Sequence, residues 1–171
     1  MKGRHLKTAT LAPEIARLLR LIDEAFQKKS WHGTNLRGSV RGMSAQQAGW
    51  RPRGARHSIA DLVVHCAYWK YAVRRRLRGD PRGSFPLKGS NWFKLPEPLS
   101  EPAWREFVAL LETEHRALRG AVAELSAGQI EVTPKGRQTS NRMLIHGIVL
   151  HDIYHAGQIQ MLKALARQRE T

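Results

Sequence analysis

Two histidines, His151 and His155, lie four positions apart in a segment that otherwise has the apolar pattern of a core helix. At helical spacing both fall at the centre of the apolar stripe, which consists of Leu144, Ile148, His151, His155, Ile159 and Leu162. A buried imidazole without a hydrogen-bond partner costs about 1–3 kcal/mol. Because side chains four residues apart converge on one helix face, a shared metal ion would satisfy both rings. Many helices carry such a pair by chance, so the spacing alone leaves metal binding and a hydrogen-bonded core open.

A third histidine, His65, lies in another helical segment, at the edge of that segment's apolar stripe and next to Trp69. A side chain at such an edge can reach the interior of a bundle from the side. His65 is therefore the natural third ligand for the pair formed by His151 and His155. Its neighbour Cys66 falls within the stripe itself, where a small buried apolar side chain is the better interpretation.

The remaining histidines have weaker links to this site. His115 lies in the middle of a third apolar stripe and would be a ligand, a partner of a ligand or a hydrogen-bonded core residue; we favour the last. His146 falls on the outer face of its helix and should be solvated. His32 lies in a loop after Trp31, which we expect to anchor the loop, and His57 directly precedes a helix cap.

Four long segments carry a helical period, and no segment has convincing strand patterning. They cover residues 13–28, 58–78, 102–125 and 141–167. Ser58 with Asp61 is a capping pair and Gly79 is suited to the end of the second segment, while Ser140 or Asn141 caps the fourth. The connections between the first three segments are long and rich in Gly and Pro. The pattern predicts an all-α four-helix bundle with long crossover connections, in which residues 1–10 form a flexible tail and residues 11–171 a single domain.

The composition limits the classes of protein to consider. The chain has 171 residues, one cysteine and a net charge of +15 from 29 Lys and Arg against 14 Asp and Glu. One cysteine excludes an internal disulfide framework, and no apolar run is long enough to cross a membrane, so we expect a cytoplasmic protein. The charge would attract polyanions, but no nucleic-acid-binding motif accompanies it, so nucleic-acid binding is not favoured. The densest basic cluster, Arg74 to Arg82, follows a helix end, where positive charge has a local reason to occur.

Three segments resemble the DinB-like (DinB/YfiT) superfamily, in the order found in that family. They are "SWHGTNLRGSVRGMSAQQAGWRP", "HSIADLVVHCAYWKYAVRRRLRG" and "IHGIVLHDIYHAGQIQMLK". The resemblance implies a four-helix bundle with crossover topology, often dimeric. It also implies a divalent metal ion, commonly zinc or nickel, held by three histidines, which correspond here to His65, His151 and His155.

The same resemblance implies a site with positions open to water or substrate, as in catalytic rather than structural metal sites. Some relatives transfer groups to or from small thiols, and others are described as hydrolases. We therefore expect a metal-dependent transferase or hydrolase acting on a small thiol or an anionic small molecule, with arginines of the Arg74 to Arg82 cluster binding its carboxylates. Asp152 and Gln158 are expected to orient the ligands. The alternative is a non-enzymatic bundle that binds polyanions or acts in a stress response, with a structural or vestigial metal site.

Overall fold

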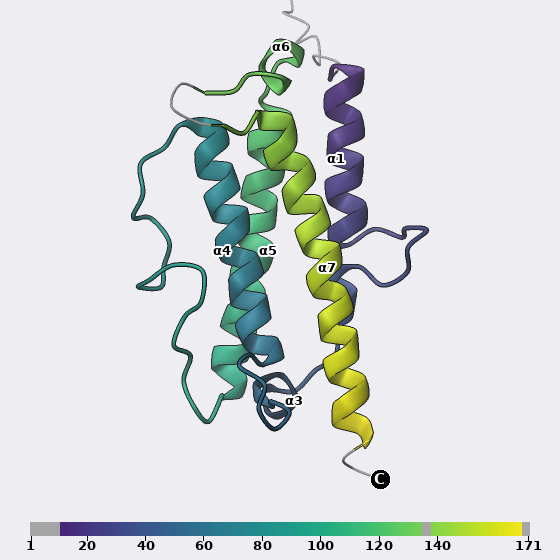
Figure 1. The fold of residues 1–171 in the computed structure, drawn as a ribbon, viewed down its shortest axis with the longest axis vertical. Helices are drawn as coiled ribbons and strands as arrows, with labels where there is room; N and C mark the ends of the chain where they lie inside the picture. Colours follow the sequence, from purple (N-terminus) through teal and green to yellow (C-terminus); the bar gives the residue numbers. More distant parts are fainter. Residues whose placement is uncertain (1–10, 135–137, 169–171) are drawn as a thin grey trace, which may run out of the picture.

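Four long helices form the protein, which is described by a computed structural model over residues 11–134 and 138–168 (Figure 1). The long helices are α1 (Pro13–Phe26), α4 (Ile59–Arg78), α5 (Glu101–Ala123) and α7 (Asn141–Gln168), and the short ones are α2 (Leu36–Ser39), α3 (Ala45–Gly49) and α6 (Ala127–Ile130). No β-strand occurs in the described residues, which confirms the predicted all-α bundle. The predicted tail, residues 1–10, lies outside them. None of the described helices is both long and apolar enough to span a membrane.

The bundle has one connection that runs its whole length. Helices α1 and α7 point in one direction and α4 and α5 in the other, so the chain must return to the starting end of α4 before α5 begins (Figure 1). Residues 79–100 make this return along the outside of the bundle (Figure 1). This is the crossover connection that the sequence predicted. Helix α4 packs against α5 and α7, and α1 packs against the same two helices from the opposite corner.

Local sequence signals set the ends of these helices. The Ser58 hydroxyl accepts a hydrogen bond from the Asp61 backbone N–H at 3.2 Å, and the Asp61 carboxylate accepts one from the Ser58 N–H at 2.7 Å. This pair satisfies backbone donors that the first turn of α4 leaves unpaired. Gly79 ends the helix at φ 75°, a conformation that glycine adopts without strain. Ser140, one of the two caps considered for α7, accepts from the Met143 N–H at 3.3 Å.

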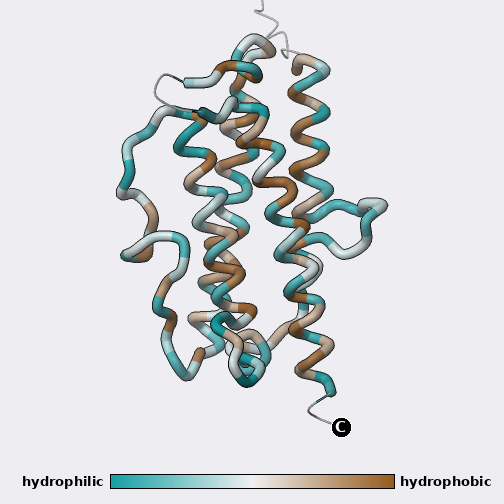
Figure 2. The backbone as a smooth tube through the Cα atoms, viewed as in Figure 1, coloured by the Kyte–Doolittle hydropathy of each residue, from teal (hydrophilic) through white to brown (hydrophobic). Residues whose placement is uncertain are grey.

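A polar layer divides the apolar interior into two clusters. Hydrophobic residues recur along the long helices (Figure 2), but they pack as one cluster around Leu62 and Ile159 and another around Leu18 and Ile148. Buried polar side chains occur alongside them, from all four long helices: Asp23, Lys70, His115, Asp152 and His155 among them. A buried polar group is tolerated only when it has hydrogen-bond or ion-pair partners. The partners of the side chains in this layer therefore show which of them stabilise the fold and which are available for function.

Candidate metal centre

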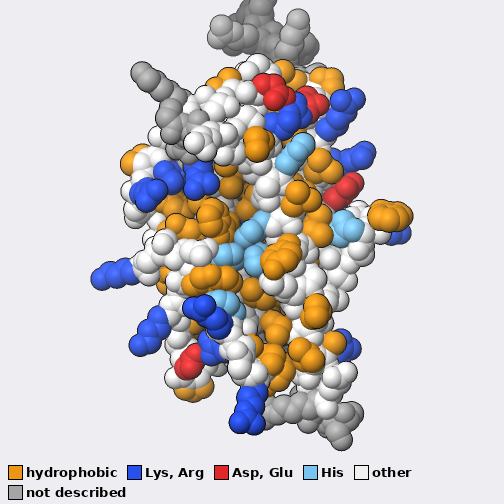
Figure 3. Space-filling model, viewed as in Figure 1, with side chains coloured by type: hydrophobic (Ala, Val, Ile, Leu, Met, Phe, Trp, Pro, Cys, Tyr) orange, Lys and Arg blue, Asp and Glu red, His pale blue; other side chains and the backbone are white. Residues whose placement is uncertain are grey.

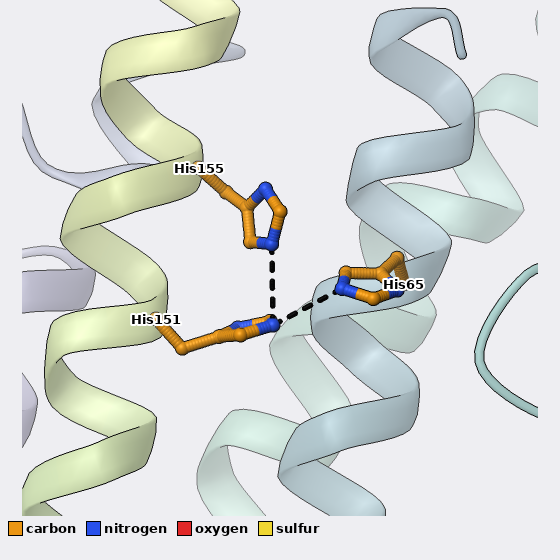
Figure 4. Close-up of side chains that lie close together, drawn as sticks. All are labelled: His65, His151 and His155. Carbon is orange, nitrogen blue, oxygen red and sulfur yellow. Dashed lines mark hydrogen bonds between the residues drawn. The ribbon is translucent and has the colours of Figure 1, made fainter. Parts of the chain in front are cut away.

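The three predicted ligands converge between two helices. His65 projects from α4 toward His151 and His155, which project from consecutive turns of α7 (Figure 4). The His151 Nε2 atom lies 3.1 Å from the His65 Nε2 atom and 3.2 Å from the His155 Nε2 atom. His65 and His155 are buried, with exposed fractions of 6% and 5%. The sequence-based expectation that these three side chains meet is therefore confirmed.

The spacing of the three nitrogens fits a metal ion. A tetrahedral zinc ion with Zn–N distances of about 2.0–2.1 Å separates its ligand nitrogens by about 3.3 Å. The separations of 3.1 and 3.2 Å between Nε2 atoms are close to that value. Three imidazoles with their ring nitrogens this close form a donor set that could hold a divalent transition-metal ion.

Neighbouring groups fix the rings so that their lone pairs face one another. The His65 Nδ1–H donates to the Asn91 carbonyl oxygen at 2.9 Å, and because a carbonyl can only accept, the proton of a neutral His65 lies on Nδ1. The His155 Nδ1–H donates to the Gln158 Oε1 at 2.7 Å in the same way. The buried His151 Nδ1 has no hydrogen-bond partner within the described part of the chain. A single proton on the His151 Nε2 atom could serve only one of the two Nε2 atoms that face it, whereas a cation between the three Nε2 atoms would use the lone pairs of all three rings.

The protonation state of the rings favours ligation as well. Burial, followed by the proximity of His155, His65 and Lys70, lowers the pKa of His151 to about 3. Burial lowers the pKa of His155 to about 4, and it lowers that of His65 below its ordinary value. All three imidazoles are therefore neutral at physiological pH, which is the form that binds metal ions.

Two residues of the crossover connection complete the site, and sequence reasoning missed both. Asn91 adopts φ 65°, a left-handed conformation that Asn tolerates better than most residues. Besides holding His65 through its carbonyl, it accepts a hydrogen bond from the Trp69 indole N–H at 2.9 Å through its side chain. Trp92 stacks between the rings of His65 and His57, at centroid distances of 4.0 and 3.6 Å. The only sequence signal for this role is an Asn and a Trp side by side in a loop otherwise rich in Gly and Pro.

The two residues expected to orient the ligands have different roles. Gln158 does so, since it accepts from His155 and its own amide donates to the Tyr154 hydroxyl at 3.0 Å. The expectation was wrong for Asp152, which is buried and forms an ion pair with Lys70 of α4 instead. Asp152 also lies within reach of Cys66 and His151. Burial raises the pKa of the Cys66 thiol well above its ordinary value, so Cys66 is a buried apolar residue, as the sequence indicated.

The other histidines lie away from the three ligands or serve them indirectly. His115 is a core residue stacked on Phe26 at a centroid distance of 3.7 Å, but neither of its ring nitrogens has a hydrogen-bond partner among the described residues. It is therefore not the hydrogen-bonded core residue that we favoured. His146 is exposed, as expected. His32 is also exposed, and Trp31 does not anchor its loop because it is fully exposed itself.

A cavity of about 690 Å³ opens onto the three histidines. Its walls include Trp69, Trp92, Tyr154, Met161, Leu162 and Leu165. The basic cluster does not line this cavity. Arg75, Arg76 and Arg82 line a neighbouring pocket under the crossover connection, while Arg74 pairs with Glu114 and Arg78 with Glu124.

Comparison with known proteins agrees with this architecture. Searches of curated proteins and of solved structures found no match to the chain. A family model, that of the DinB superfamily, matches residues 30–159. The match includes α4, the crossover connection and all three histidines that converge in the bundle. The chain therefore belongs to the DinB superfamily.

Proposed function

We propose that this protein is a metal-dependent transferase that uses His65, His151 and His155 to hold a divalent ion, zinc or nickel, and acts on a small thiol. The donor set supports the metal, since three neutral imidazoles present converging Nε2 atoms. A metal ion held by three ligands keeps a position open, where it would lower the pKa of a bound thiol or water. The cavity beside the histidines gives a substrate room to reach that position.

One observation favours thiol transfer over hydrolysis. Of the described residues that line the cavity, none is Asp or Glu, and the nearest buried carboxylate, Asp152, is paired with Lys70. Hydrolysis needs a group that accepts a proton from the attacking water, usually a carboxylate or a histidine free of the metal. The histidine of the described cavity wall that is not one of the three ligands, His57, is stacked on Trp92. A thiol is intrinsically more nucleophilic and loses its proton when it ligates a metal. A site without a carboxylate therefore suits a thiol better than water.

The chain's own residues would orient the ligand rings and shield the site from water. Asn91 and Gln158 hold the rings of His65 and His155 by hydrogen bonds to Nδ1, so that Nε2 remains the ligating atom. Trp92 covers the outer face of His65 and limits the access of water to it. With its single cysteine buried and unpaired, the chain suits a reducing compartment, and we propose the cytoplasm.

Metal analysis tests the site directly. The wild type, dialysed against zinc or nickel and measured by elemental mass spectrometry, should bind one ion per chain. The variant His151→Ala should bind none. His146→Ala is the matched control, because it removes an exposed histidine of the same helix and should leave the stoichiometry unchanged. Equal metal content in wild type and His151→Ala would refute the metal centre.

Activity tests the reaction. Glutathione, bacillithiol and mycothiol would each be combined with an electrophile whose absorbance changes on thiol addition. An uncharged aromatic thiol, benzyl mercaptan, would be tested in the same way. We expect turnover with at least one of these thiols, in the metal-loaded wild type and in His146→Ala, but not in His151→Ala. Metal-dependent ester or amide hydrolysis without thiol transfer would favour the hydrolase instead.

A further inference from the structure

The cavity over the metal centre differs in chemical character from the rest of the molecular surface. The chain has 29 Lys and Arg, yet of the described residues that line the cavity none is Lys, Arg, Asp or Glu. In the space-filling view, the histidines at the centre of this face are bordered mainly by hydrophobic side chains, and most Lys and Arg side chains lie farther out, although one adjoins the lowest of the pale-blue histidines (Figure 3). An anion inside this cavity would therefore find no Lys or Arg side chain among the described lining residues.

Three of the polar side chains on the cavity wall, those of Asn91, Gln158 and Tyr154, are engaged in hydrogen bonds with their neighbours. The Asn91 side chain accepts from Trp69, and the Gln158 amide bonds both His155 and Tyr154. A carboxylate or phosphate placed away from the metal would lose its hydration and meet no ammonium or guanidinium group in return. An apolar group would instead bind favourably against the apolar walls, because the surface that the walls cover is removed from water.

We infer that the ligand of this cavity has one donor atom for the metal and an uncharged, apolar body, preferably aromatic. This inference rests on the proposed metal centre and adds the substrate class to it. A volume of about 690 Å³ leaves room for a body of one or two rings beyond the donor atom. Trp92 has both faces covered by His57 and His65, so it presents its edge, and Tyr154 and Met161 at the mouth are exposed enough to close over a ring.

The neighbouring basic pocket explains how the same protein can attract anions without binding them at the metal. Arg75, Arg76 and Arg82 line that pocket, and Trp69 and Asn91 are the described residues that it shares with the cavity over the metal centre. The hydrogen bond between these two side chains closes the shared wall. An anionic molecule drawn to the arginines would therefore remain on the other side of Trp69.

Cobalt-substituted protein and two thiols of opposite character test the inference. Benzyl mercaptan has an uncharged aromatic body, whereas mercaptoacetate carries a carboxylate next to the same donor atom. Each would be titrated into the cobalt protein while the thiolate-to-cobalt absorption band is recorded. We expect benzyl mercaptan to bind at least about tenfold more tightly, because its ring is covered by the apolar walls. Equal or tighter binding of mercaptoacetate, or no change of the spectrum with either thiol, would overturn the inference.

Two lysine variants locate the effect. Met161→Lys places an ammonium at the mouth of the cavity and should reduce the preference for benzyl mercaptan, mainly through tighter binding of mercaptoacetate. Met143→Lys is the matched control, because Met143 is a similarly exposed methionine of the same helix outside the cavity. An unchanged preference in Met161→Lys, or an equal change in both variants, would contradict the assignment. Failure of the metal centre itself is recognised separately, since the wild type would then show no cobalt spectrum before any thiol is added.

Discussion

Replacing Gln158 by Leu should weaken metal binding without removing a ligand. Gln158 Oε1 accepts from the His155 Nδ1–H at 2.7 Å, and this bond strengthens when a metal ion on Nε2 draws charge from the ring. A hydrogen bond to a charged group contributes about 1.5–3 kcal/mol, against about 0.5–1.5 kcal/mol for a neutral one. The difference, about 1–1.5 kcal/mol, is lost only from the metal-bound state and corresponds to a roughly tenfold weaker affinity.

The measurement is a competition for zinc between the protein and a chromophoric chelator, followed by absorbance at constant pH. Gln158→Glu should retain the affinity or increase it, because a carboxylate also accepts from Nδ1–H and raises the basicity of the ring. Gln160→Leu is the matched control, since Gln160 is exposed on the same helix and bonds only Thr34, at 3.4 Å. The reasoning fails if Gln158→Leu binds zinc as tightly as the wild type, or if Gln160→Leu loses as much.

Three further predictions concern stability and assembly. Burial lowers the pKa of His115 to about 3 from an ordinary 6.5, so acidification below pH 6.5 protonates the unfolded chain first, and His115 alone should account for about 2 kcal/mol of the stability lost between pH 8 and pH 5. In denaturant titrations at the two pH values, His115→Phe should show a loss that is smaller by this amount. Lys70→Met leaves the Asp152 carboxylate buried without its cation and should destabilise the protein by about 3–5 kcal/mol, more than the double replacement Lys70→Met, Asp152→Leu, as measured by chemical denaturation. The homodimer that the family resemblance implied should use exposed apolar residues of α7 outside the cavity, of which Leu150 is one, so Leu150→Lys should be monomeric by light scattering where the wild type is dimeric; a monomeric wild type would contradict this.

The helices and the ligand positions could be predicted because they follow local rules. The Ser58 and Asp61 capping pair and Gly79 determine α4 from residues adjacent in sequence. His151 and His155 share a helix face by their spacing alone, whatever the helix packs against. Pairing them with His65 needed only the expectation that the stripes of two amphipathic helices face each other in a bundle.

The parts that escaped prediction depend on distant contacts. Asn91 reaches His65 across 26 positions, and nothing in the sequence near Asn91 specifies a left-handed turn at that residue. Lysine side chains are usually exposed to solvent, and the burial of Lys70 depends on its ion pair with Asp152, 82 positions away. Such pairs become visible only when the helices are placed side by side. For the same reason Asp152 was wrongly expected to orient the metal ligands that lie next to it in sequence.

The separation of the ligands along the chain has a consequence for the order of events during biosynthesis. His65 and His151 are 86 positions apart, and the second and third ligands lie in α7, which leaves the ribosome after α4 and α5. Until α7 has emerged and docked beside α4, the nascent chain offers no site with three ligands. An ion held by all three histidines would therefore bind only after α7 has docked, and it would tie α4 to α7 and slow the reversal of that docking step.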